Sequence, residues 1–139
     1  MHNSIDTCLF CRVLTGELDA KIIAETDHAV AFLDLHPQSP GHTLVIPKVH
    51  AETLIDLPRE EAGPLFELVR DTVAQLQDTL DAPGMTIGVN QGIIAGQGVP
   101  HLHVHLMPRF EGDGAKSIHV VVKNKSTPDQ EELINSLIV

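Results

Sequence analysis

The segment His101-Leu102-His103-Val104-His105 alternates histidine with an apolar residue at every position. In an extended strand, successive side chains point to opposite faces, and residues two apart stand about 6.6 Å from each other. The pattern therefore predicts a strand with three imidazoles on one face and apolar side chains buried on the other. Because imidazole acts as base, acid, nucleophile or metal ligand near neutral pH, the histidine face predicts an active site.

The three histidines are not expected to share one metal ion. Zinc–nitrogen bonds of about 2.0–2.1 Å place two tetrahedral ligand atoms about 3.4 Å apart. His101 and His105 start about 13 Å apart along the backbone, so bringing both onto one ion would bend the strand badly. At least one histidine of the row must therefore do something other than bind a shared ion.

Length and charge restrict the class of protein. The 139 residues are expected to form one domain, 1–139, with an aliphatic core, because the chain has four Phe and no Trp or Tyr. A formal charge of -10 argues against nucleic acid as a partner, although it leaves room for a small nucleotide. No apolar run is long enough to span a membrane, and the first residues lack the apolar core of a signal peptide, so a cytoplasmic protein is expected.

The hydrophobic pattern predicts five strands, over 21–25, 29–34, 42–47, 85–91 and 100–108, with short helices over 8–15 and 128–138. One long helix is expected to end at Leu80 and to begin at Gly63 or Pro64, because the ring of Pro64 would break a helix that began earlier. Its buried stripe is expected to contain Ala62, Leu65, Phe66, Val69, Val73, Leu76 and Leu80. The predicted fold class is α+β, an antiparallel sheet with one long helix packed on it.

Two further motifs flank this framework. The glycine-rich stretch 92–98 leads directly into the histidine row, where its backbone N–H groups could hold an anion beside the imidazoles. Cys8 and Cys11 have CxxC spacing, which in a chain of this kind indicates metal or redox use rather than a structural disulfide. The βαβ context of a redox pair is absent, whereas a pair of free buried thiols stays an alternative.

The segment His101 to Met107 has the form His-φ-His-φ-His-φ-φ, with φ apolar, and resembles the signature of the histidine triad family of nucleotide hydrolases and transferases. The similarity extends in order and spacing from about Cys8 to Arg109, through 31–35, 41–48 and 90–109. It implies a HIT-like fold, a homodimer and a small-molecule nucleotide substrate. The zinc-binding CxxC-type members of the Hint-like branch are the most similar in pattern.

This resemblance implies a role for each histidine of the site. His103 would attack the α-phosphorus of a purine nucleoside phosphoramidate, an adenylate or a dinucleoside polyphosphate, forming a nucleotidyl-histidine that water then hydrolyses. His105 would donate to the phosphate or leaving group, and His42 would assist proton transfer or orient His105. For His42, the alternative is an edge histidine with a structural hydrogen bond.

The resemblance also implies the remaining site residues. Asp34 would accept the ribose hydroxyls, unless it is an ordinary turn residue, and Leu9, Phe10, Val13, Leu18, Phe32, Leu33 and Leu35 would line the base pocket. The phosphate would be surrounded by Asn90, Gly96, Gln97, Val99, His103 and His105. Gly98 stands where family members often carry Ser or Thr, so one hydroxyl contact is missing. A structural Zn²⁺ would be bound by Cys8, Cys11, His50 and His101.

Three classes of function follow from the sequence. The leading one is an enzyme that hydrolyses or transfers a nucleoside monophosphoryl group. The second is a nucleotide-binding module with little turnover, and the third is a metal-dependent phosphohydrolase with His101 and His103 as catalytic ligands. The base and the leaving group stay open.

Overall fold

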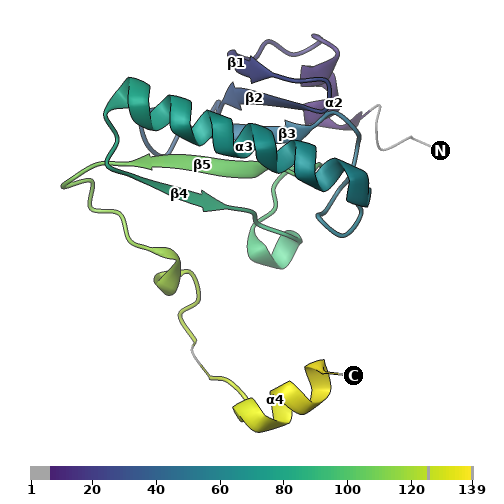
Figure 1. Ribbon diagram of the computed structural model, residues 1–139, viewed down its shortest axis with the longest axis vertical. Coiled ribbons are helices and arrows are strands. Elements are labelled where there is room, and N and C mark those ends of the chain that lie inside the picture. The colour runs from purple at the N-terminus through teal and green to yellow at the C-terminus, as the bar shows by residue number, and fades with distance from the viewer. Residues whose placement is uncertain (1–6, 125, 139) are drawn as a thin grey trace.

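A computed structural model describes residues 7–124 and 126–138 and contains one five-stranded antiparallel sheet (Figure 1). Its strands lie in the order β1-β2-β3-β5-β4. They are β1 Ile22–Glu25, β2 Ala29–Leu33, β3 Thr43–Pro47, β4 Gly84–Gly88 and β5 Val104–Arg109. The helices are α2 Leu9–Leu14, α3 Arg59–Leu80 and α4 Gln130–Leu137, with 3-10 turns η1 Ile93–Ala95 and η2 Ile118–Val120. The predicted class, α+β with one long helix on an antiparallel sheet, is confirmed.

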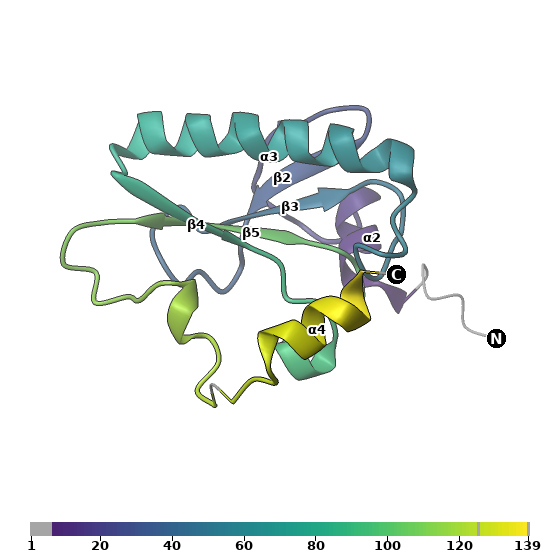
Figure 2. The same ribbon diagram turned by 60° about the horizontal axis from the view of Figure 1, so that its bottom comes forward.

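The long helix α3 covers one face of the sheet, whereas α2, η1 and α4 lie on the other side (Figure 2). Its buried residues are Leu65, Leu68, Val69, Thr72 and Leu76. This spacing places them on one stripe of the helix. The stripe packs on Val45, Val104 and Leu106 of the sheet and closes the larger hydrophobic core.

The predicted start of α3 was wrong, because the helix begins at Arg59 and runs through Pro64. Pro64 removes one backbone hydrogen bond near the beginning of the helix. The helix dipole favours the earlier start, because Glu60 and Glu61 place negative charge in the first turn. Packing of the buried stripe adds stability that a single missing bond does not offset. The predicted burial of Phe66 was also wrong: its side chain is 44% exposed, and Leu68 takes a core position instead.

The strand that carries the histidines is shorter than predicted, since β5 begins at Val104 rather than near Pro100. Pairing with β4 stops where Gly88 meets His105, and pairing with β3 stops where Val45 meets Val104. Pro47, two residues beyond Val45, has no N–H to extend the ladder. The alternation of faces nevertheless continues. Leu102 joins Val104 and Leu106 in the core under α3, and the histidines turn to the opposite face.

A second, smaller core lies on that opposite face, between α2 and the sheet. Phe10, Cys11 and Val13 of α2 pack there on Val30, Phe32, Leu44 and Ile46. The Sγ of Cys8 caps the helix by accepting the N–H of Cys11 at 3.4 Å. This packing brings both cysteines and Phe10 next to the histidine row.

After β5 the chain leaves the sheet and passes below it to α4 (Figures 1 and 2). Almost every described residue from 111 to 138 is exposed. In the described ranges, no helix has both the length and the apolar character needed to cross a membrane.

We expect Leu65→Ala to lower the free energy of unfolding by about 2–4 kcal/mol, because it empties a fully packed position under α3. Phe66→Ala is the matched control on the next residue and should cost less than about 1 kcal/mol, since that ring is half in solvent. Urea denaturation of both variants measures the difference. A larger loss for Phe66→Ala would contradict the observed helix face.

Candidate active site and metal centre

The ring of His103 is held in one tautomer. Its Nδ1 lies 2.7 Å from the carbonyl oxygen of His101. A carbonyl only accepts, so Nδ1 must carry the proton and Nε2 must carry the lone pair. The ring is 7% exposed and stands edge-on to Phe10 with centroids 5.1 Å apart. In its neutral form, His103 therefore presents the lone pair of Nε2 in a fixed orientation.

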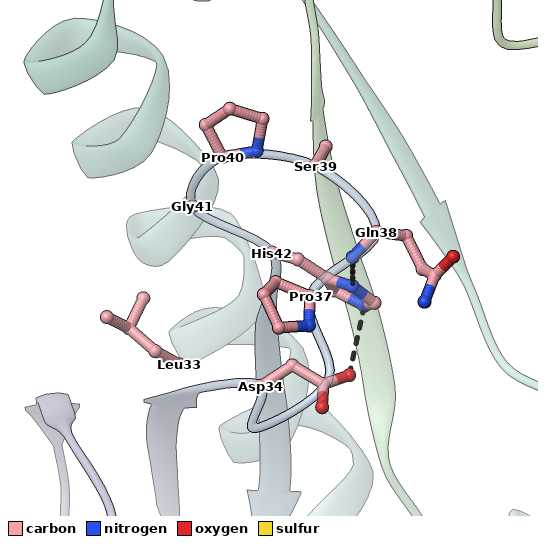
Figure 3. Close-up of a pocket in the computed structure, with 8 residues that line it drawn as sticks. All are labelled: Leu33, Asp34, Pro37, Gln38, Ser39, Pro40, Gly41 and His42. Atoms are coloured by element: carbon pink, nitrogen blue, oxygen red, sulfur yellow. Dashed lines mark hydrogen bonds and ion pairs between the residues drawn. The ribbon is translucent and has the colours of Figure 1, made fainter.

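His105 is held in the opposite tautomer by a chain of hydrogen bonds. The backbone N–H of Gln38 donates to Nδ1 of His42 at 3.0 Å, so the proton of neutral His42 sits on Nε2 (Figure 3). That Nε2 lies 3.0 Å from Nδ1 of His105 and donates to it. The proton of His105 is then on Nε2. Its ring centroid is 5.0 Å from that of His103, so a donor stands beside the lone pair.

Asp34 adds negative charge next to His42. Its Oδ2 lies 3.4 Å from Nε2 of His42, and its Oδ1 accepts the N–H of His36 at 3.0 Å. The ligand atoms of Asp34, His42 and His105 are close enough for a cation, but the direct bond between the two rings already uses one nitrogen of each. Asp34 also lines the open pocket formed with the 37–42 turn (Figure 3).

Burial keeps the two donor histidines neutral. Desolvation lowers the pKa of His105 from 6.5 to about 4, with a further contribution from the neighbouring His103 and His42. Desolvation also lowers the pKa of His42, and the charge of Asp34 opposes that shift. Both rings are therefore single-proton donors at neutral pH rather than cations.

An apolar cavity of about 120 Å³ lies between α2 and the ends of β2 and β3, with Asp34 in its lining. Six residues expected at the base pocket line it: Leu9, Phe10, Val13, Leu18, Phe32 and Leu35, together with Asp34. Leu33 does not, because it lies on the face of β2 opposite to Phe32 and lines the pocket of Figure 3 instead. Leu44, which pairs with Phe32 and lies on the same face, also lines the cavity.

The glycine-rich loop is built differently from the predicted anion cradle. Gly92 and Gly96 have φ of 88° and 96°, a conformation that favours glycine. The N–H groups of Gly96 and Gln97 donate to carbonyls within the loop, and the Gln97 amide is bonded to Gly92, Glu52 and Val99. Gln97 and Gly96 thus shape the loop. Within residues 7–124 and 126–138, the N–H groups of Gly98 and Val99, which precede His101 in the chain, donate to no backbone carbonyl.

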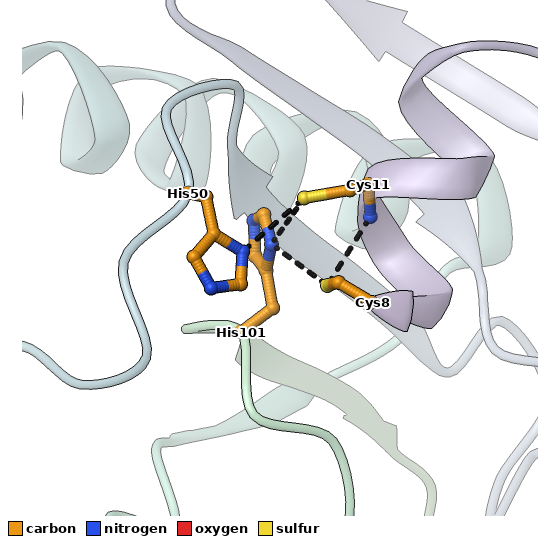
Figure 4. A group of neighbouring side chains, drawn as sticks. All are labelled: Cys8, Cys11, His50 and His101. Carbon is orange, nitrogen blue, oxygen red and sulfur yellow. Dashed lines mark hydrogen bonds between the residues drawn. The ribbon is translucent and has the colours of Figure 1, made fainter. Parts of the chain in front are cut away.

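Two thiols and two imidazoles converge at the His101 end of the histidine row (Figure 4). The ligand atoms of Cys8, Cys11, His50 and His101 all lie within 4.8 Å of one another. The Nδ1 of His101 is 3.4 Å from Sγ of Cys8, and the Nδ1 of His50 is 3.2 Å from Sγ of Cys11. The four residues predicted as metal ligands are therefore brought together.

The donor set fits a structural zinc ion. His101 donates its Nε2–H to the carbonyl of Pro47 at 2.9 Å, so Nδ1 is unprotonated and faces the thiols. A ligand histidine bonded in this way to a backbone carbonyl is a common feature of metal sites. Burial and the adjacent Cys8 raise the pKa of the Cys11 thiol to about 12, a shift that direct bonding to a cation reverses. His103 is not in this group, so the four ligands use only the first histidine of the row.

Comparison with known proteins identifies relatives of this chain. The model of the HIT domain family matches residues 15–112. An uncharacterized HIT-like protein of Methanocaldococcus jannaschii is 43% identical over 117 residues, covering 84% of this chain and 90% of the relative. The adenosine 5'-monophosphoramidase hnt1 of Schizosaccharomyces pombe is 35% identical over 103 residues, covering 74% of each chain.

A solved structure shows the same fold. The zinc-bound histidine triad family protein of Mycobacterium smegmatis superposes with a TM-score of 0.75 at 33% identity. The alignment covers 92% of this chain and 88% of that protein.

The lowered pKa of His105 predicts a pH-dependent stability. Between pH 6.5 and about 4 the unfolded chain binds a proton at this ring that the folded chain does not. The free energy of unfolding therefore falls as the pH is lowered through this window. His105→Asn should reduce that fall by roughly 1–2 kcal/mol, allowing for the solvent that still reaches the ring. Urea denaturation at pH 7 and pH 4.5 measures it, with His119→Asn as an exposed control. Equal pH dependence in wild type and His105→Asn would refute the assignment.

Proposed function

The chain belongs to the HIT domain family, and we propose that it cleaves nucleoside monophosphoryl compounds at the α-phosphorus. Its substrates would be nucleoside phosphoramidates, and after them adenylates and dinucleoside polyphosphates. The single observation that carries the proposal is the unprotonated Nε2 of His103 beside the donor Nε2–H of His105. The name of the S. pombe relative, an adenosine 5'-monophosphoramidase, supports the substrate class.

In the first step, Nε2 of His103 attacks the α-phosphorus and forms a P–N bond. The bond to the leaving nitrogen breaks, and that nitrogen departs as an amine with the proton from Nε2 of His105. The ring of His105 keeps the hydrogen bond from His42, and the positive charge that the His103 ring acquires, 5.0 Å away between ring centroids, balances the charge left on the donor ring. Positive charge on the His103 ring is stabilised by its bond to the His101 carbonyl.

In the second step, water attacks the phosphorus and the P–N bond to His103 breaks. The proton of water returns to Nε2 of His105, so the enzyme is restored and the products are a nucleoside monophosphate and an amine. A competing acceptor in place of water would make the same site a nucleotidyl transferase.

The nucleotide is proposed to bind with its base and ribose at the apolar cavity and its phosphate at the glycine-rich loop. The base would enter the apolar cavity next to Phe10, and Asp34 at its rim would accept the ribose hydroxyls. The backbone N–H groups of Gly98 and Val99 would donate to the phosphate oxygens. Backbone donors do not depend on a side chain, so Gly98 can serve here without the hydroxyl that other members carry.

We further propose that Cys8, Cys11, His50 and His101 bind one Zn²⁺ as a closed tetrahedral site. The cluster geometry and the zinc-bound relative from M. smegmatis support this assignment. The ion would link α2, the loop after β3 and the segment before β5, without contact to the phosphate. A homodimer is also proposed, because exposed apolar side chains follow β5, among them Ile118, Val121, Val122 and Leu137.

His103→Ala should lower kcat by at least about a thousandfold, because it removes the nucleophile. Quenching in alkaline denaturant, in which a phosphorus–nitrogen bond to histidine survives, should trap label from phosphorus-labelled adenosine phosphoramidate on wild type and on the control His119→Ala, and none on His103→Ala. If wild type binds AMP but never carries label, the protein is a nucleotide-binding module. Activity that a chelator abolishes and zinc restores at constant folded fraction would instead indicate a metal-dependent phosphohydrolase.

Removal of zinc should affect stability more than chemistry. Purified wild type should contain one zinc per chain by elemental analysis, and chelation should lower Tm by on the order of 10 °C. The kcat of the fraction that stays folded should change less than twofold. Cys11→Ser should lose the zinc, whereas His119→Ala should keep it. The same Tm for apo and metal-loaded protein would disprove a structural ion.

A further inference from the structure

The short helix α2 takes part in two sites at once. Cys8, which is its N-cap, and Cys11 belong to the cluster of thiols and imidazoles. The residues of α2 that line the apolar cavity assigned to the base are Leu9, Phe10 and Val13. We propose that α2 couples the two sites, so that metal binding at Cys8 and Cys11 sets the affinity for the nucleobase. This inference rests on the proposed function and on the proposed zinc site.

The spacing of these residues makes the two sites move together. Cys8 and Cys11 are three residues apart, as are Phe10 and Val13, so each pair lies on one side of the helix. The Sγ of Cys8 also accepts the N–H of Cys11, which joins the first thiol to the helix backbone. A displacement of α2 that separates the thiols from the imidazoles therefore shifts this wall of the cavity as well.

The opposite wall of the cavity is fixed independently of α2. Phe32 and Leu44 lie on β2 and β3, which are both interior strands of the sheet and are packed against α3 on their other face. By contrast, α2 has six residues, and a helix of that length is not stable in water without tertiary contacts. The width of the cavity therefore depends on what holds α2 against the sheet.

Besides apolar packing, the two thiols hold α2 in place. Among the residues that the structure describes, the hydrogen bonds and ion pairs that join 8–14 to the chain beyond Leu18 are those of the thiols with His50 and His101. Their Sγ–Nδ1 distances are 3.2–3.5 Å. Zinc bonds of about 2.0 and 2.3 Å place tetrahedral nitrogen and sulfur atoms roughly 3.5 Å apart, so α2 already has the position that a bound ion requires. Without the ion, these contacts are weak, since a thiol is a poor donor.

Phe10 is the side chain through which the two sites touch. Its ring stands edge-on to His101 and His103, with centroids 6.0 and 5.1 Å apart. It also stands edge-on to Phe32 at 5.6 Å, and both phenyl rings line the cavity. The lone pair of His103 is oriented separately, by the carbonyl of His101. The coupling is therefore expected in the affinity for the nucleotide and not in the chemical step.

Thermodynamic linkage gives the first test, on the wild-type protein. If bound zinc raises the affinity for AMP, then AMP must raise the affinity for zinc by the same factor. We expect saturating AMP to raise the zinc affinity, measured by competition with a chromogenic chelator, by about five- to thirtyfold. Ribose 5-phosphate is the matched control, because it keeps the ribose and phosphate but has no base to fill the cavity. It should change the zinc affinity by less than about twofold.

Cys11→Ser, which should lose the zinc, gives the second test. Its KM for adenosine phosphoramidate should rise by about five- to thirtyfold, while its kcat stays within about twofold of wild type. Leu65→Ala is the matched control for lost stability, because it weakens the core under α3 without touching either site, and it should keep the wild-type KM. Circular dichroism at the assay temperature measures the folded fraction of each variant.

The outcomes separate this inference from the proposed function. If neither AMP nor ribose 5-phosphate changes the zinc affinity while wild type cleaves adenosine phosphoramidate, the coupling is wrong and the phosphoramidase function stands. An equal effect of the two ligands would assign the link to the phosphate and overturn the role of α2. A fall in the kcat of Cys11→Ser at unchanged KM would also overturn it. If wild type neither binds AMP nor cleaves adenosine phosphoramidate, the proposed function itself is wrong, and the inference is overturned with it.

Discussion

Hydrogen bonds from imidazole N–H groups to backbone carbonyls are the interactions on which this site depends. His101 donates through Nε2 to Pro47, and His103 donates through Nδ1 to the carbonyl of His101. The two rings are therefore fixed in opposite tautomers, although they lie two residues apart on one face. One lone pair faces two thiols and the other faces the proposed phosphate position. A row of identical side chains acquires different chemistry because each ring finds a different acceptor.

The same constraint explains why β5 begins late. The carbonyls of Pro47 and His101 are used by imidazoles, and Pro47 has no N–H to offer to a neighbouring strand. The ladder between β3 and β5 thus gives way to side-chain bonds where the site begins. Loss of regular pairing at this point is part of how the rings are oriented.

The period-two pattern of residues 101–106 predicted correctly which side chains face the core, and the CxxC spacing pointed to a cluster that the fold assembles. Other features depend on long-range contacts that no local pattern encodes. Pro64 predicted a helix break because the sequence alone does not show how strongly Leu65 and Leu68 of α3 pack on the sheet. The strand Ala29–Leu33 puts Phe32 and Leu33 on opposite faces by alternation alone, but which of the two faces lies toward α2 follows only from the packing of the second core. The tautomers, and the use of Gln97 to brace its own loop, required atomic positions.

His101 contributes to both centres, but through different parts of the residue. Its ring belongs to the cysteine cluster, whereas its main-chain oxygen orients His103. Every amino acid has that oxygen, so the orientation of His103 does not require histidine at position 101. Over evolutionary time the cysteines and the 101 ring could be exchanged together for apolar residues while the neighbouring chemistry persisted. The orientation of the His103 ring is thereby separable from the composition of the cysteine cluster.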